Sequence, residues 1–253
     1  MATARNPGQY KGMVCWFDAN SVSEADGVEV LGWENEVDTD YGDLEGTATN
    51  VPVVVADGIG DRKVLYFDGL NACHLQMTES DWDTGYNNSE LWMVVRHTVT
   101  PGAGAKNWFG PTNSLFNGDW MGPRYLNTSG TYVNHSSQVG GTWKYSTTQY
   151  TQDEDWHLVR FRNWVKAPGV ANQAFHYFYE DGVLIHSEAD SNEIFGSGNR
   201  GYWGIGMSAV GDLSEVEVAE WFWAHDTVFT CADQWSLQIY YQDKYPDLSI
   251  TMP

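Results

Sequence analysis

The 253-residue sequence is poor in positive charge, in cysteine and in long apolar runs. Lysine and arginine number 13 against 34 aspartate and glutamate residues, so the formal net charge at pH 7 is −21. A surface with so little positive charge repels phosphate backbones and anionic lipids, and we expect neither nucleic acid nor membranes among the partners. The same charge favours solubility, and most acidic side chains are expected on a solvated surface.

Cysteine occurs three times, at Cys15, Cys73 and Cys231. An odd, sparse set without a Cys-x-x-Cys pair does not form a disulfide framework. Cys15 and Cys73 lie in apolar, strand-like runs, which predicts buried free thiols. The seven histidines form no His-Glu-x-x-His motif and no cluster with cysteine. The sequence therefore predicts no metal site and no cofactor.

Long apolar runs are absent as well. No run approaches the roughly 20 residues that span a bilayer as a helix. Residues 1–12 hold no apolar stretch of the kind that a secretory leader carries. The expectation is a protein that acts in the cytoplasm or leaves the cell by another route, such as lysis. Residues 1–12 are interpreted as an N-terminal arm, 13–246 as one domain and 247–253 as a C-terminal tail.

Aromatic residues are abundant, with 13 Trp, 14 Tyr and 10 Phe. Short apolar or alternating segments predict β-strands at 13–18, 63–68, 73–77, 91–96, 156–161, 175–179, 183–185, 202–207 and 216–223. Asp-Gly pairs at 26–27 and 181–182 predict tight turns. Only the C-terminal part predicts a helix, capped by Thr230 and ended by Pro246. The predicted fold is an all-β, two-sheet antiparallel jelly-roll sandwich with a short C-terminal helix.

Short motifs, in order along 13–245, resemble the concanavalin A-like lectin and glucanase superfamily, whose laminin-G-like domains are jelly rolls. They include an apolar-Trp-apolar-Asp-Ala run at 14–19, a Phe-Asp-Gly strand end at 67–69 and a Trp-His-Leu-Val strand followed by a Glu-Asp-Gly turn. An Ala-Glu pair at 219–220 and a closing helix with a terminal Lys-Tyr complete the series. The resemblance implies the fold, and it is compatible with a phage virion-associated member. These are core and turn positions, so they indicate little about function.

The candidate binding residues lie in the Gly- and Asn-rich middle of the chain, where Trp108, Trp120, Tyr125 and Trp143 stand outside alternating core patterns. Flat aromatic rings flanked by Asn and Asp suit the faces of sugars, where hydroxyl groups bond to amides and carboxylates. The same rings suit a protein–protein interface. A plain core role is the third alternative for each.

Three glutamates, Glu215, Glu217 and Glu220, form a Glu-x-Glu-x-x-Glu motif. It is similar to the Glu-x-Asp-x-x-Glu motif of some glucanases of this superfamily, in which two carboxylates act as nucleophile and general acid. The middle Asp is missing here, and Glu220 also fits the superfamily's non-catalytic Ala-Glu position. A regular strand would place Glu220 on the face opposite the other two, so a β-bulge would be required to bring them together. We therefore predict no catalytic residue.

Asp38, Asp40, Asp43 and Glu45 crowd one segment. Carboxylate oxygens are the ligands that calcium prefers, although the spacing is not that of an EF-hand. A solvated acidic loop without a metal is the alternative.

Three functions are compatible with these features. The first, and the one we prefer, is a non-catalytic lectin-like binding or assembly module at a virion surface, made in the host cytoplasm, such as a phage decoration, fibre or adhesion protein. Its partners would be capsid or tail proteins or sister subunits in a homo-oligomer, with surface glycans as ligands; extended termini suit such docking. The second is a monomeric carbohydrate-binding module of a cellular protein. The third is a glycoside hydrolase using Glu215, Glu217 and Glu220.

Overall fold

The computed structural model describes residues 3–37, 42–46, 50–68, 73–77, 88–98, 104–107, 109–111, 120–127, 133–139, 142–145, 153–165, 174–190, 203–205, 215–225, 227 and 229–251. Within residues 104–145 the structure describes the backbone only.

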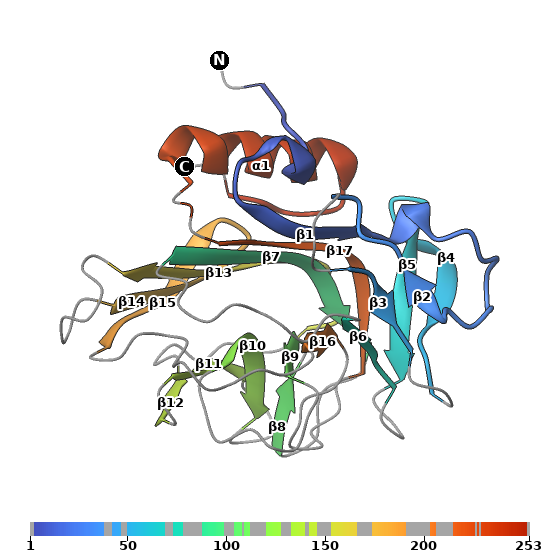
Figure 1. The fold of residues 1–253 in the computed structure, drawn as a ribbon, viewed down its shortest axis with the longest axis horizontal. Coiled ribbons are helices and arrows are strands. Elements are labelled where there is room, and N and C mark those ends of the chain that lie inside the picture. Colours follow the sequence, from blue (N-terminus) through green and yellow to red (C-terminus); the bar gives the residue numbers. More distant parts are fainter. Residues whose placement is uncertain are drawn as a thin grey trace.

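The largest sheet has the strand order β15-β14-β13-β7-β17-β5-β4, and β1 pairs with the second half of β17 (Figure 1). Its strands are β1 (Met13–Asp18), β4 (Val53–Ile59), β5 (Arg62–Asp68), β7 (Asn88–His97), β13 (His157–Val165), β14 (Ala174–Glu180), β15 (Val183–Asp190) and β17 (Glu215–His225). All their pairings are antiparallel.

Two smaller sheets form the second layer, below the large sheet in Figure 1. One has the order β2-β3-β6-β16-β9 and the other β12-β11-β10-β8, and β9 lies beside β10. Their strands are β2 (Gly32–Trp33), β3 (Leu44–Glu45), β6 (Leu75–Met77), β8 (Gly104–Asn107), β9 (Phe109–Pro111), β10 (Trp120–Asn127), β11 (Val133–Val139), β12 (Thr142–Tyr145) and β16 (Trp203–Ile205). The predicted all-β antiparallel sandwich is confirmed.

The large sheet is buried on both faces, and the sequence of its central strands reflects this. In β7, Leu91, Met93 and Val95 pack between the two layers, in what we term the sandwich core. The intervening Trp92 and Val94 pack on the opposite, outer face, in what we term the helix-side core. Successive side chains of a strand point to opposite faces, so a strand that is apolar at every position is covered on both sides. Burial of each such side chain stabilises the fold by about 1.5–3 kcal/mol.

Helix α1 (Cys231–Lys244) covers the outer face of the large sheet (Figure 1). It begins with the predicted capping box: Thr230 Oγ1 accepts from the Asp233 backbone N–H at 3.2 Å, and the Asp233 carboxylate accepts from the Thr230 N–H at 2.9 Å. Tyr241 stacks on Trp92 with ring centroids 6.1 Å apart. No helix in the described part of the chain is long and apolar enough to cross a membrane.

Both ends of the described chain pack on this outer face. Tyr10 lies against Phe229 with ring centroids 5.2 Å apart. Leu248 and Ile250 are buried in the helix-side core. We term residues 246–251 the C-terminal strap. The domain boundaries at residues 12 and 246 stay a prediction.

The thiols behave as the sequence predicts. Cys15 and Cys73 are buried and free, and Cys231 is free and exposed at the start of α1. Burial raises the pKa of the Cys15 thiol and raises the pKa of Cys73 to about 11. Neither buried thiol is therefore poised to react.

Candidate functional site

The four aromatic residues selected from the sequence lie in the second layer or outside the described residues. Trp108 is outside them. Trp120 and Tyr125 lie on β10 and Trp143 lies on β12. The backbone register brings Trp120 and Trp143 opposite Gln138 of β11, from its two sides. A ligand-binding role for these four residues stays a prediction.

The bulge required by the glutamate motif is present in β17. The pairing of β17 with β7 shifts register between Val218 and Glu220. Val218 packs in the sandwich core, whereas Ala219 packs in the helix-side core and Glu220 contacts α1. Since side chains alternate up to the bulge, Glu215 and Glu217 also face outward. All three carboxylates thus share the outer face of the large sheet.

Glu220 nevertheless does not open onto a site, because it is fully buried. Its carboxylate accepts from Trp16 Nε1 at 2.6 Å, Lys244 Nζ at 2.7 Å, Tyr245 Oη at 2.9 Å and Tyr240 Oη at 3.0 Å. Burial raises the pKa of Glu220, and the charge of Lys244 opposes that rise. With every contact directed at protein atoms, Glu220 ties β17 to β1 and α1.

This buried cluster explains three of the motifs that carry the superfamily resemblance. Asp18 of the first motif forms an ion pair with Lys244 of the last, and Lys244 also pairs with Glu220 of the Ala-Glu motif. A buried ion pair with its hydrogen bonds satisfied specifies one arrangement of the elements that supply it. These three motifs therefore contain the residues that attach the helix to the sheet.

Glu215 and Glu217 line a cavity of 440 Å³ that we term the acidic pocket. Tyr66 Oη and Thr98 Oγ1 donate to Glu215 Oε1 at 2.9 and 2.8 Å, and Arg96 Nε donates to Glu217 Oε2 at 2.6 Å. Burial and the hydrogen bond to Glu215 raise the pKa of Tyr66 to about 12. The described residues that line it are Val55, Tyr66, Arg96, His97, Thr98, Glu154, Glu215 and Glu217.

The two carboxylates of the acidic pocket are held by their neighbours. Glu215 accepts from Tyr66 and Thr98, and Glu217 accepts from Arg96. A carboxylate has about four acceptor positions, so both can also accept hydrogen bonds from the hydroxyl groups of a bound polyol.

A row of aromatic side chains that the sequence analysis did not select lies on the outer face of the sheet. Phe175, Tyr177 and Tyr179 alternate along β14, and Trp164 of β13 lies at one end. Ring centroids are 5.5 Å apart for Trp164 and Phe175, 6.4 Å for the next pair and 6.5 Å for the last. All four side chains are half-buried. We term these four residues the aromatic row; the alternation of aromatic residues at 175, 177 and 179 was its sequence signal.

Arg160 holds one end of the aromatic row in place. Its guanidinium carbon lies 4.5 Å from the ring centroid of Tyr179 and 5.0 Å from that of Trp92. The guanidinium also donates from Nε and Nη2 to the two oxygens of Glu90, at 3.0 and 3.2 Å. A planar cation between two rings, paired with a buried carboxylate, has little freedom to move. Arg160 thereby holds the Tyr179 end of the row.

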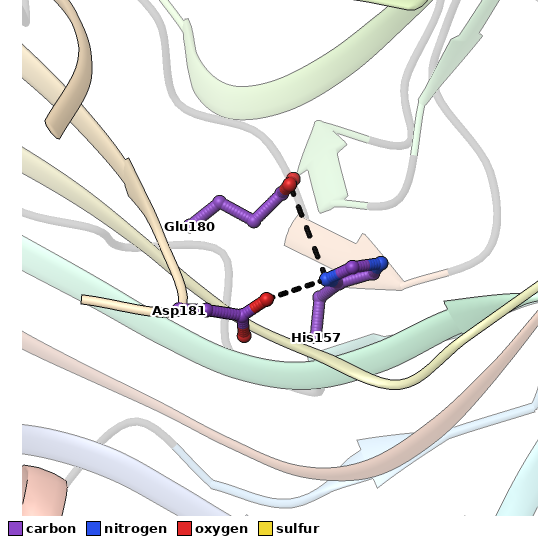
Figure 2. A group of neighbouring side chains, drawn as sticks. All are labelled: His157, Glu180 and Asp181. Atoms are coloured by element: carbon purple, nitrogen blue, oxygen red, sulfur yellow. Dashed lines mark hydrogen bonds and ion pairs between the residues drawn. The ribbon is translucent and has the colours of Figure 1, made fainter. Parts of the chain in front are cut away.

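His157, Glu180 and Asp181 form a polar cluster at the turn between β14 and β15, separate from the Glu220 cluster and the acidic pocket (Figure 2). His157 Nδ1 lies 2.7 Å from Asp181 Oδ2 and 3.9 Å from Glu180 Oε1, and Nε2 lies 2.8 Å from Asp153 Oδ1. Burial lowers the pKa of His157, but the hydrogen bond to Asp181 and the charges of Glu180 and Asp181 outweigh it and raise the pKa to about 10. Burial also raises the pKa of Glu180 to about 7, against the charge of His157.

His157, Glu180 and Asp181 place potential metal-ligand atoms within 4.8 Å of one another, and among the described residues they are the one group of His, Cys, Asp or Glu to do so. Both imidazole nitrogens already have carboxylate partners, so an ion pair accounts for the arrangement. The acidic segment considered for calcium is described in part: Asp43 Oδ1 accepts from the Asn35 backbone N–H at 2.8 Å. For this segment both alternatives from the sequence, a calcium site and a solvated acidic loop, stay open.

No family model matches the sequence, and no curated protein matches it. Solved structures share its fold. Domain 4 of AbnA, a GH43 extracellular arabinanase from Geobacillus stearothermophilus, in complex with arabinotriose, is 13% identical with a TM-score of 0.58, over 90% of this chain and 96% of that one. The receptor-binding domain of botulinum neurotoxin D is 10% identical with a TM-score of 0.58, over 92% of this chain and 53% of that one.

Trypanosoma rangeli sialidase in complex with sialic acid is 13% identical with a TM-score of 0.59, over 96% of this chain and 36% of that one. The chain thus spans about half the length of the botulinum domain and about a third of the sialidase. At this level of identity the likeness shows the fold. The protein is a β-sandwich with a jelly-roll-like architecture.

Proposed function

We propose that this protein is a non-catalytic carbohydrate-binding module and that the aromatic row contacts the glycan. The observation that carries the proposal is the row itself. Four rings in succession on one sheet face form an apolar strip onto which the C–H faces of successive sugar units can stack. Arg162 lies opposite Tyr177 in register and supplies a polar group beside the rings.

The similar structures support a carbohydrate ligand, because one holds arabinotriose and another holds sialic acid. The acidic pocket supports a binding role, because protein donors hold the carboxylates of Glu215 and Glu217 in place.

The test is affinity electrophoresis of the wild-type chain through gels that contain arabinan, xylan, β-glucan or galactan. We expect retardation by at least one polysaccharide. Tyr177→Ala, in the middle of the row, should weaken that binding roughly tenfold, about 1.4 kcal/mol. Trp235→Ala is the matched control, because Trp235 is an exposed aromatic residue on α1 that belongs to neither the row nor the pocket.

Two results would count against the proposal. Retardation that Tyr177→Ala leaves unchanged would remove the row as the contact surface, and no retardation by any polysaccharide would remove the function. Release of reducing sugar ends that Glu217→Gln abolishes would establish the glycoside hydrolase in its place.

The biological setting stays a prediction. A virion surface, with capsid or tail proteins or sister subunits as partners, is proposed from the sequence features alone. The cellular carbohydrate-binding module is the alternative setting for the same binding activity. Oligomeric state separates the two, as set out in the Discussion.

A further inference from the structure

We propose that the acidic pocket is a second binding site, which takes one uncharged sugar residue and rejects acidic sugars. This inference rests on the proposed carbohydrate-binding function and names a sugar class for a site separate from the aromatic row. Arg96 of the pocket and Trp92 are four residues apart on β7. Trp92 contacts Arg160, which lies at one end of the aromatic row. Four residues of a strand span about 13 Å, so the two sites do not overlap.

The pocket is organised by protein contacts. Tyr66 and Thr98 hold one oxygen of Glu215, and Arg96 holds one oxygen of Glu217. The Arg96 guanidinium carbon in turn lies 5.0 Å from the ring centroid of Trp156. Side chains that are already ordered lose little freedom when a ligand binds, which favours affinity.

The remaining polar groups match a polyol. A carboxylate offers about four acceptor positions, and the described contacts use one oxygen of each glutamate, so acceptor positions remain for sugar hydroxyl groups. The terminal nitrogens of Arg96 can donate to a ring or hydroxyl oxygen. A volume of 440 Å³ lies within the range of about 300–1,000 Å³ typical of small-molecule pockets.

Charge determines which sugars fit. Among the described residues, the carboxylates of Glu154, Glu215 and Glu217 line the pocket against one guanidinium, that of Arg96. His97 adds no positive charge near neutral pH, because burial lowers its pKa to about 3. The pocket is therefore negative within a chain of net charge −21, which repels sugar carboxylates. A divalent cation is disfavoured by the guanidinium that already pairs with Glu217.

The experiment is a nuclear magnetic resonance titration of the 15N-labelled full chain, observing the Nε–Hε signal of Arg96 and assigning it with Arg96→Lys. The probes are methyl arabinofuranoside, methyl galactoside and methyl mannoside as neutral sugars, galacturonic acid and N-acetylneuraminic acid as acidic sugars, and calcium chloride. We expect a saturable shift with at least one neutral glycoside and none with the acidic sugars at the same concentration.

Variants separate the pocket from the row. Glu217→Gln should weaken the neutral glycoside tenfold or more, and Glu215→Gln serves the same purpose if Glu217→Gln fails to fold. Tyr177→Ala should leave the titration unchanged. A saturable shift with calcium alone, equal binding of acidic sugars, or no response to any neutral glycoside would overturn the inference. Polysaccharide retention that depends on Tyr177 would survive each of those results, so failure of the pocket and failure of the proposed function remain distinguishable.

Discussion

The protonation of His157 is linked to folding. Its pKa is raised from 6.5 to about 10 by its carboxylate neighbours, against the opposing effect of burial. A group whose pKa is higher in the folded than in the unfolded state contributes stability that is complete below the unfolded value. That contribution is lost as pH rises through the folded value. The window is therefore pH 6.5 to 10.

We expect His157→Gln to reduce the free energy of unfolding by roughly 1–3 kcal/mol near pH 7 and by progressively less towards pH 10. Urea unfolding of both proteins at pH 7, 8, 9 and 10 measures the difference. The pKa of Glu180 is raised to about 7, so the contribution of Glu180 to stability changes mainly below pH 7. A difference that stays constant from pH 7 to 10 would contradict the assignment.

Glu220 shows how a residue's role depends on distant partners. The sequence placed it in two motifs, one catalytic in some glucanases and one structural in the superfamily. The structure assigns it to the second, because Lys244 at the end of α1, the following Tyr245 and Trp16 of β1 all donate to its carboxylate. These partners are separated from it by 24, 25 and 204 positions, which no local pattern reveals.

At the scale of elements, the turn between β14 and β15 is attached to the C-terminal strap. The Thr251 backbone N–H donates to the Asp181 carbonyl at 2.7 Å. Gly182 has a φ of +81°, and a Cβ added there would lie 2.1 Å from the Thr251 carbonyl oxygen, closer than any non-bonded contact allows. Gly27 offers a matched comparison, because its φ is +73° and no atom lies within 4 Å of an added Cβ.

We expect Gly27→Ala to cost about 1–2 kcal/mol, the penalty of a left-handed conformation for a residue with a Cβ. Gly182→Ala should cost at least about 1–3 kcal/mol more, because the strap must also move. Chemical denaturation of the two variants measures both values. Deletion of residues 251–253 should bring the two costs closer together. Equal costs in the full-length chain would show that the strap is not held at this turn.

The sequence predicted strands at the places of β1, β5–β7 and β13–β17 and the helix α1, but it set no bounds for β2–β4 and β8–β12. β1 and α1 were predicted because their apolar pattern and capping residues are local signals. β4 was missed, since it contains Asp57 and Gly58 and its pairing with β5 shifts register between Val55 and Ile59. Irregular pairing breaks the alternation by which a half-buried strand is recognised.

At the scale of the whole molecule, the open question is assembly. The virion-surface proposal predicts a stable homo-oligomer that depends on residues 1–11. Light scattering on the full chain and on a chain that starts at Gly12 tests this. We expect the full chain to be an oligomer and the shortened chain a monomer. Monomers in both cases would contradict the virion placement and favour the cellular carbohydrate-binding module.

That shortened chain needs a folding control. Tyr10 is buried against Phe229, and its hydroxyl donates to the Asp233 carbonyl at 3.3 Å, so its removal takes contacts from the outer face. Tyr10→Ala in the full-length chain loses the same packing and keeps the remainder of the segment. If the shortened chain is a monomer and Tyr10→Ala is still an oligomer, assembly depends on residues 1–11 themselves. If both are monomers, the loss of packing at Tyr10 explains the result.

The sequence by itself determined that this protein is an antiparallel β-sandwich with a capped C-terminal helix, tight Asp-Gly turns and free buried thiols. Those features follow from periods of two, from short-range capping and from turn residues, all of which act between near neighbours. Only the tertiary structure decided which groups share a surface. The pairing of β17 with β7 places Glu217 opposite Arg96 in the acidic pocket, the bulge in β17 turns Glu220 to the same face as Glu217, and the pairing of β13 with β14 aligns Trp164 with Phe175. Register and bulges depend on pairing between strands that are far apart in the chain. The periodicity of the sequence therefore predicts which face of a sheet a side chain occupies, but not which residues it contacts there.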